Sequence, residues 1–115
     1  MTMRETRDPL VGDELIEISL RPYEVHFIFA ESVVQLGTSF NVSASGAPLT
    51  TISPKERSGN LLVLWSLIGA TVREVVWGET VRIRFADDSI LLVGPTEGRP
   101  RGTIMGRRDM TIEDF

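Results

Sequence analysis

The chain offers few side chains that could carry out chemistry together. It has one histidine, His26, and no cysteine, so a metal site or a nucleophile–base pair would lack its usual companions. His26 alternates with the apolar residues of its segment, which predicts a side chain that faces solvent or a partner. We therefore expect no bound metal and no catalytic role for His26.

Two pairs of acidic residues are the remaining candidates for acid–base chemistry. Asp87 and Asp88 are adjacent in a segment with the composition of a turn, where Asp is common. Glu17 and Glu74 occupy matching places in an internal repeat, either as solvent-facing strand residues or as a pair near a two-fold axis. A two-carboxylate site needs groups that lie close together and differ in pKa. We expect surface roles instead, hence no enzyme activity, no catalytic residue and no cofactor.

Basic residues gather only towards the C-terminal end. Arg99, Arg101, Arg107 and Arg108 are separated by glycine and proline, so they need not share a face. This segment either meets an acidic partner surface or solubilises the chain. The formal net charge of −4 argues against nucleic acid or an anionic membrane as the partner.

An internal repeat is the strongest signal in the sequence. Residues 10–37 and 67–94 carry the same apolar pattern, with Phe29 matched to Phe85. Each copy contains three short runs of alternating apolar residues, which is typical of a three-stranded meander. In each first strand two apolar residues are three positions apart, which predicts a β-bulge or, alternatively, a strand that is covered on both faces. Such a repeat indicates two copies of one unit that bury their apolar faces together.

The predicted fold is a single mostly β domain over residues 1–115, as expected for this length. The two meanders form a small sandwich or a closed barrel, with one short helix in the connection between them. The predicted parts are repeat 1 at about 10–37, a connection at 38–66, repeat 2 at about 67–94 and a C-terminal segment at 95–115.

The connection combines polar, Gly and Pro residues with one apolar run. Residues 53–56 have the form of a helix start, with Ser before Pro. Residues 61–67 are nearly all apolar, which fits a helix or a strand; we favour one or two helical turns because Leu prefers helix. Further expectations are an exposed strand at 38–42, a last short strand at 103–105 and a charged tail at 107–115.

Apolar residues on the outer faces of the predicted strands suggest an interaction surface. Ile28 and Leu92 fall out of phase with the core positions, so residues 43–60 or a second chain must cover them. Trp77 ends a strand beside a glycine, and both it and Trp65 are expected as anchors in the core or at its rim. The possible interaction surface comprises Ile28, Trp77, Leu92, Arg99 and Arg101.

Residues 67–72 and 81–93 resemble a small uncharacterised bacterial domain family that repeats the pattern L-x-G-x-x-V…F-x-D. The resemblance covers about residues 10–106 and implies a β-meander fold without catalytic residues. The chain departs from the pattern at Asp88 and Ser89, where a glycine is expected in the turn. Genes of this kind are sometimes presumed to neutralise toxins, so the resemblance implies an immunity-like role.

Two functions remain from the sequence. The first is a non-catalytic bacterial interaction module that forms a homodimer or binds another protein. The second is a small-ligand-binding β-barrel with a cavity between its meanders. Residues 1–9 lack the apolar core of a signal peptide, and no apolar run is long enough to cross a bilayer, so we expect a cytoplasmic protein.

Overall fold

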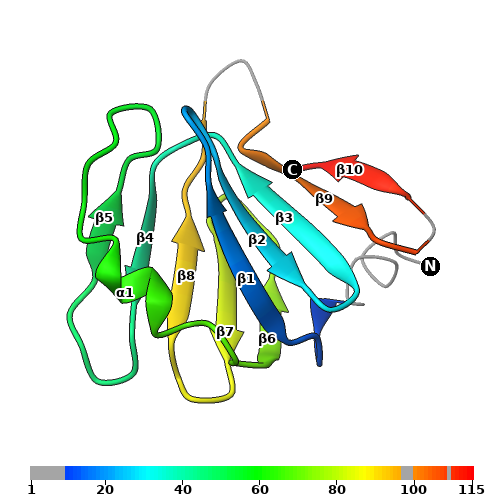
Figure 1. The fold of residues 1–115 in the computed structure, drawn as a ribbon, viewed down its shortest axis with the longest axis horizontal. Coiled ribbons are helices and arrows are strands. Elements are labelled where there is room, and N and C mark those ends of the chain that lie inside the picture. Colours follow the sequence, from blue (N-terminus) through cyan, green and yellow to red (C-terminus); the bar gives the residue numbers. More distant parts are fainter. Residues whose placement is uncertain (1–9, 97–99, 109) are drawn as a thin grey trace.

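The computed structural model describes residues 10–96, 100–108 and 110–115. Two five-stranded antiparallel sheets pack face to face, and Figure 1 shows the first in front of the second. The first sheet has the order β1 (Leu15–Leu20), β2 (Val25–Phe29), β3 (Ser32–Leu36), β9 (Gly102–Gly106) and β10 (Ile112–Asp114). The second has the order β5 (Thr50–Ile52), β4 (Phe40–Ser43), β8 (Ile90–Val93), β7 (Val81–Phe85) and β6 (Val72–Val76). Helix α1 (Leu62–Trp65) lies between β5 and β6 in the chain.

The mostly β fold and the short helix in the connection are confirmed. Within the described residues the two sheets do not close into a barrel, so the sandwich is the correct alternative. No helix in this part of the chain is long and apolar enough to cross a membrane.

The two repeats form the same meander. β1, β2 and β3 pair in order, and so do β6, β7 and β8. The register shifts between Leu15 and Glu17 in one copy and between Val72 and Glu74 in the other. These register shifts are the two predicted bulges. Each bulge lets two apolar side chains three positions apart face the core.

The repeats meet around a pseudo-two-fold axis. The N–H of Gly12 donates to the carbonyl of Val72 at 2.8 Å, and the N–H of Gly69 donates to the carbonyl of Leu15 at 2.7 Å. Gly12 and Gly69 have φ values of +89° and +96°, a region that strongly favours glycine. The matched glycines thus fix the crossing of the two units.

Each sheet is completed by a hairpin from the other half of the chain. β4 and β5 follow β3 but pair with β8, whereas β9 and β10 follow β8 but pair with β3. The predicted connection therefore contains a strand, β5, that its polar composition concealed. The predicted charged tail likewise contains β10, while the expected strand at 103–105 is confirmed within β9.

The core lies between the inner faces of the sheets. The rings of Phe27 in β2 and Phe40 in β4 meet edge to face at 5.7 Å, and the inward positions of β2 and β7 are buried. Phe40 and Val42 are buried too. The strand expected to be exposed at 38–42 is therefore an interior strand, since it lies between β5 and β8.

Two local predictions were wrong, and one strand is shorter than its sequence pattern. Tyr23 continues the alternation of the inward residues of β2 but is 65% exposed, because β2 begins only at Val25 and Tyr23 belongs to the preceding turn. Residues 53–56 form a turn rather than a helix start. Trp65, expected to be an anchor in the core or at its rim, is 75% exposed because only Leu64 of α1 points into the core.

Candidate binding cleft beside the first strand

The pseudo-two-fold axis creates two equivalent openings between the sheets. β1 and β6 are both edge strands. One opening lies between β1 and the edge strand β5 of the other sheet, and the second lies between β6 and the edge strand β10. Leu20, which ends β1, corresponds in the repeat to Trp77, which follows β6. Phe40 and Gly102 hold equivalent positions, since each begins the strand that the hairpin adds to a meander. Ile52 is the partner of Phe40, and Phe115 is hydrogen-bonded to Gly102, so Ile52 corresponds to Phe115.

Aromatic rings fill the opening beside β6. Trp77 and Phe115 meet edge to face, with ring centroids 5.7 Å apart. The guanidinium of Arg101 lies 5.8 Å from the centre of the Phe115 ring and donates to the carbonyls of Gly78 and Glu79. Such a contact combines apolar packing with a cation–π attraction. Residues of the chain itself therefore occupy this opening, and an open hollow of about 300 Å³ remains beside Arg101 and Phe115.

A glycine makes room for the closing ring. A Cβ atom at Gly102 would lie 3.1 Å from Cζ of Phe115 and 2.3 Å from the carbonyl oxygen of Gln35. A larger residue at position 102 would therefore push β9 from β3 and displace the ring. The corresponding position in the second sheet is Phe40, whose own ring fills the core there.

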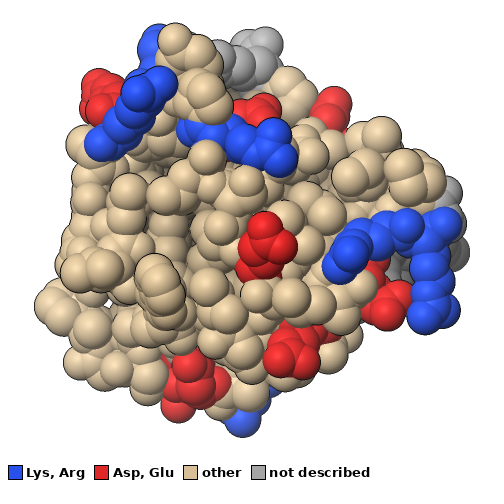
Figure 2. Space-filling view, in the orientation of Figure 1, with Lys and Arg blue, Asp and Glu red and all other residues tan. Residues whose placement is uncertain are grey.

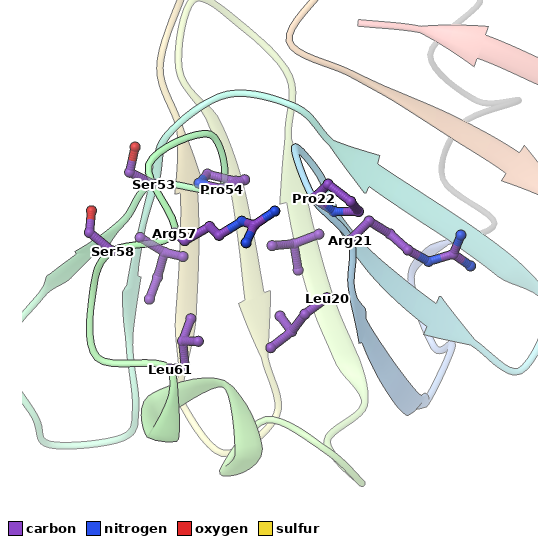
Figure 3. Close-up of a pocket in the computed structure, with 10 residues that line it drawn as sticks. Leu20, Arg21, Pro22, Ser53, Pro54, Arg57, Ser58 and Leu61 are labelled. Carbon is purple, nitrogen blue, oxygen red and sulfur yellow. The ribbon is translucent and has the colours of Figure 1, made fainter.

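The opening beside β1 is a cleft of about 350 Å³. Leu20 and Ile52 line it at the positions where Trp77 and Phe115 occupy the other opening, and both are smaller than the aromatic residues that they correspond to. The remaining walls come from the turn after β1, from the start of β2, from the loop after β5 and from the residue before α1: Arg21, Pro22, Val25, Ser53, Pro54, Arg57, Ser58 and Leu61. In Figure 3, Leu20 and Pro22 lie on one side of the cleft and Arg57 and Leu61 on the other, whereas the side chains of Arg21, Ser53 and Ser58 point away from it.

Arg57 reaches into the cleft from a tight loop. Ser53 and Ser58 close this loop by exchanging backbone hydrogen bonds of 2.9 and 3.2 Å. Arg57 has a φ of +54°, a conformation that costs a residue other than glycine on the order of 1 kcal/mol. In Figure 3 its guanidinium extends towards Leu20 and Pro22. Among the described residues, no carboxylate or carbonyl pairs with this guanidinium.

A second hollow of about 310 Å³ continues the cleft along β1. Leu20 and Leu61 belong to both, so the two form one groove. Its walls are the edge of β1 and the helix: Ile16, Glu17, Ile18, Leu20, Leu61, Leu64, Trp65 and Ile68. Figure 1 shows α1 in the same layer as the first sheet, beside β1. In Figure 2 the surface over this region is largely uncharged.

The edge of β1 offers backbone groups to the groove. The N–H of Arg21 donates to the carbonyl of Glu24 at 2.8 Å, so Arg21 and, by alternation, Ser19 direct their backbone groups towards β2. Ile18 and Leu20 then direct theirs towards the open edge. An extended segment placed in the groove can pair with these groups as an added strand.

The predicted interaction residues do not form one surface. Ile28 and Leu92 are half-buried on the outer faces of different sheets, where Ile28 neighbours Val33 and Leu92 lies between Arg82 and Asn41. Residues 43–60 do not cover them, because β4 and β5 extend the second sheet sideways.

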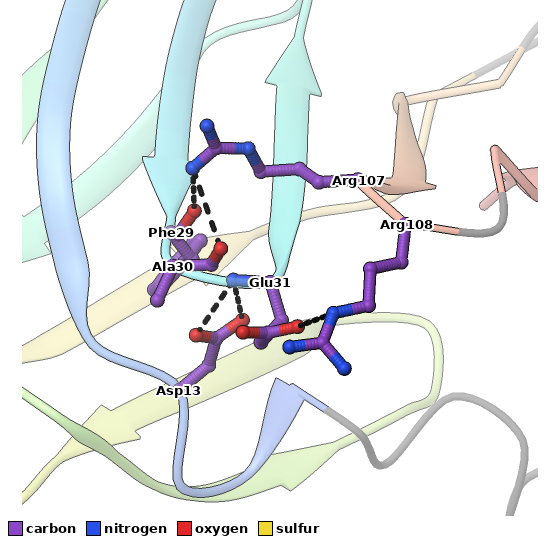
Figure 4. Close-up of polar contacts among 6 residues, drawn as sticks. All are labelled: Asp13, Phe29, Ala30, Glu31, Arg107 and Arg108. Atoms are coloured by element: carbon purple, nitrogen blue, oxygen red, sulfur yellow. Dashed lines mark hydrogen bonds and ion pairs between the residues drawn. The ribbon is translucent and has the colours of Figure 1, made fainter.

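Among the described residues of the predicted interaction surface, Trp77 and Arg101 come together around Phe115. Arg99 lies outside the described residues. Figure 4 shows that Arg107 instead donates to the carbonyls of Phe29 and Ala30, while Arg108 pairs with Glu31 at 3.2 Å. These contacts fasten the C-terminal segment to the turn between β2 and β3.

The candidate acidic residues and His26 occupy separate places in the described part of the fold. Glu17 and Glu74 are exposed on different sheets, which agrees with the solvent-facing alternative, and Asp87 and Asp88 lie in a hairpin turn. The His26 side chain is 12% exposed and contacts Glu24 at 2.7 Å. Among the described residues, no cluster of His, Asp and Glu could hold a metal ion.

Sequence reasoning missed the residues of the groove. The sequence pattern predicts Trp65 as an anchor in the core or at its rim, predicts a helix start at residues 53–56 just before Arg57, and does not single out Leu20 or Arg57. The usable signal was the repeat itself, because Leu20 aligns with Trp77. A change from a large aromatic to a smaller residue between matched positions marks a place where the two halves differ in packing.

No protein family, curated protein or solved structure matches this chain. The resemblance to a bacterial meander family therefore stays a prediction.

Proposed function

We propose that this protein is a non-catalytic interaction module that binds an extended apolar segment of another protein between β1 and α1. One observation carries the proposal: the groove joins exposed apolar side chains to the open backbone edge of a strand. Ile16 and Leu20 are 50% and 54% exposed, and Trp65 lies opposite them on the helix. Exposed apolar surface of this kind marks interaction sites on soluble proteins.

The groove favours a single strand over a whole sheet as its occupant. Helix α1 lies beside β1 in the layer of the first sheet, so a second copy that approached edge to edge would meet the helix. A single segment instead contacts β1 through its backbone and α1 through alternate side chains. The homodimer expected from the sequence is the competing outcome, and an immunity-like role in the cytoplasm would be one use of such a site.

A small apolar molecule is the second candidate ligand. The cleft volume of about 350 Å³ falls at the lower end of the range for small-molecule sites. This alternative requires only the cleft, whereas the proposed segment also uses the β1 edge.

The test is a selection of displayed random peptides of roughly ten residues, followed by amide hydrogen exchange on the purified complex. Selected peptides should slow exchange at Ile18 and Leu20, whose amides point to the open edge. Trp65→Ser should weaken their binding. Tyr23→Ser is the matched control, because Tyr23 is a similarly exposed aromatic residue that does not line the groove.

Three outcomes contradict the proposal. One is the absence of any peptide that protects both amides. Another is equal loss of binding in the two variants. The third is a stable dimer in sedimentation velocity that protects the same amides without any peptide, which would assign the groove to a second copy.

A further inference from the structure

The filled opening of this protein indicates what the open one accommodates. Around the pseudo-two-fold axis, Leu20 and Ile52 stand where Trp77 and Phe115 make their ring contact. The backbone around both openings follows the same meander with the same bulge. The cleft is therefore the space that an aromatic ring occupies in the equivalent half of the molecule.

An arginine lies at each of the two openings, but only the guanidinium of Arg101 has hydrogen-bond partners in the described part of the chain. Arg101 lies over Phe115 and its guanidinium is occupied by two carbonyls of the turn after β6. Arg57 extends towards the corresponding turn after β1, where Pro22 lies. Its guanidinium has no partner among the described residues. A guanidinium at the wall of an apolar cleft favours a carboxylate, which it can bind through two parallel hydrogen bonds.

From these two observations we infer that the cleft binds an aromatic side chain with a carboxylate beside it, as the anchor of the partner segment. The inference rests on the proposed function for its biological setting, and it concerns only the cleft and not the β1 edge. The ring replaces the missing Trp77–Phe115 contact, and the carboxylate pairs with Arg57. The strained φ of Arg57 fits this role, because residues held in unfavourable conformations cluster at binding sites.

The closing experiment uses indole-3-propionate and its neutral amide as probes, with binding followed by methyl NMR at Leu20 and Ile52. A ligand of this size is expected to bind with a Kd on the order of 1 mM. The carboxylate should bind about tenfold more tightly than the amide, as expected for a hydrogen bond to a charged group. Arg57→Ser should remove this difference.

Lys55→Ser is the matched control for charge. Lys55 belongs to the same loop but does not line the cleft, so its removal should leave the tenfold preference intact. Equal binding of carboxylate and amide to the unsubstituted protein, or equal effects of the two substitutions, would overturn the role of Arg57.

A second pair of variants tests the ring position. Leu20→Trp combined with Ile52→Phe restores the two rings of the filled opening and should abolish binding of both probes. Leu20→Trp alone changes a half-exposed side chain and serves if the double variant does not fold. Unchanged binding in a folded variant would contradict the inference, as would the absence of binding to the unsubstituted protein. Slowed exchange at Ile18 with selected peptides, but no binding of the probes, would leave the strand proposal intact and remove the aromatic anchor.

Discussion

Single residues explain why one opening between the sheets is filled and the other is not. Leu20 and Trp77 hold matched positions at the ends of equivalent strands, yet only Trp77 has an aromatic partner, Phe115. The smaller side chains at two positions, Leu20 in place of Trp77 and Ile52 in place of Phe115, thus account for the cleft beside β1. Arg57 adds a charge to that cleft through a backbone conformation that glycine would adopt more easily.

Arg57→Gly should stabilise the protein while weakening its preference for acidic ligands. The substitution relieves the left-handed conformation at φ +54°, and the gain is partly offset by the greater freedom of glycine in the unfolded chain. We expect the free energy of unfolding to rise by about 0.5–1 kcal/mol in denaturant titrations. Lys55→Gly, at a loop position without a positive φ, should give no such rise. A loss of stability in Arg57→Gly would show that the side chain holds the loop.

Asp13 should give the stability a dependence on pH. Asp13 as a residue is 5% exposed, and its carboxylate accepts hydrogen bonds from the N–H of Glu31 at 3.1 and 3.2 Å, as Figure 4 shows. Burial raises the pKa of Asp13 above its ordinary value of 3.8, against the opposing effect of these hydrogen bonds. The folded protein therefore keeps the Asp13 proton to higher pH than the unfolded chain does. Protonated Asp13 stabilises the fold at low pH, and this contribution is lost as pH rises through the pKa of Asp13 in the folded state.

Asp13→Asn removes that titration while keeping an acceptor for the backbone. The stability of the variant relative to the unsubstituted protein should improve as pH rises from about 3 to 7, as measured by urea titration at each pH. A difference that changes in the opposite direction would mean that the hydrogen bonds outweigh burial and that the pKa of Asp13 is lowered.

At the scale of elements, the exchange of hairpins between the two halves determines where the openings lie. β4 and β5 complete the second sheet, and β9 and β10 complete the first. Each meander therefore has one edge paired with a hairpin and one edge left at the side of the sandwich. The two hairpins differ in length and sequence, so the edges of β1 and β6 have different neighbours. Helix α1 flanks the β1 edge, whereas Phe115, which follows β10, packs on Trp77 beside β6.

Phe115→Ala should open the second rim. The ring contact with Trp77 and the partly buried area of Phe115 together predict a loss of about 1–3 kcal/mol in the free energy of unfolding. Trp77, which is partly buried, should then become more accessible to iodide quenching, measured in a Trp65→Phe background so that Trp77 is the only tryptophan. Trp65→Phe alone is the control. Unchanged quenching would mean that Trp77 is shielded without the ring.

At the scale of the whole molecule, the repeat allowed the architecture to be predicted but not the site. In β2 and β7 the alternation of the apolar residues determines which face is buried, because only the apolar face can pack in the core. The two bulges were predicted from the same alternation. β5 and β10 were missed because short polar edge strands owe their pairing to the neighbouring strand and not to their own pattern. The groove was missed because it depends on which hairpin completes which sheet, and local patterns carry no such information.

The pseudo-two-fold axis itself predicts equal energetic roles for the matched core rings. Phe29 and Phe85 are both fully buried in equivalent strands, β2 and β7. Each replacement by alanine leaves a cavity at a corresponding place, so Phe29→Ala and Phe85→Ala should each lower the free energy of unfolding by about 3–5 kcal/mol. Losses that large approach the whole stability of a small domain, so they are best compared by denaturant titration at low temperature. The exposed Tyr23→Ala should cost less than about 1 kcal/mol. If one phenylalanine proved dispensable and the other essential, the two halves would not share the core as the repeat requires.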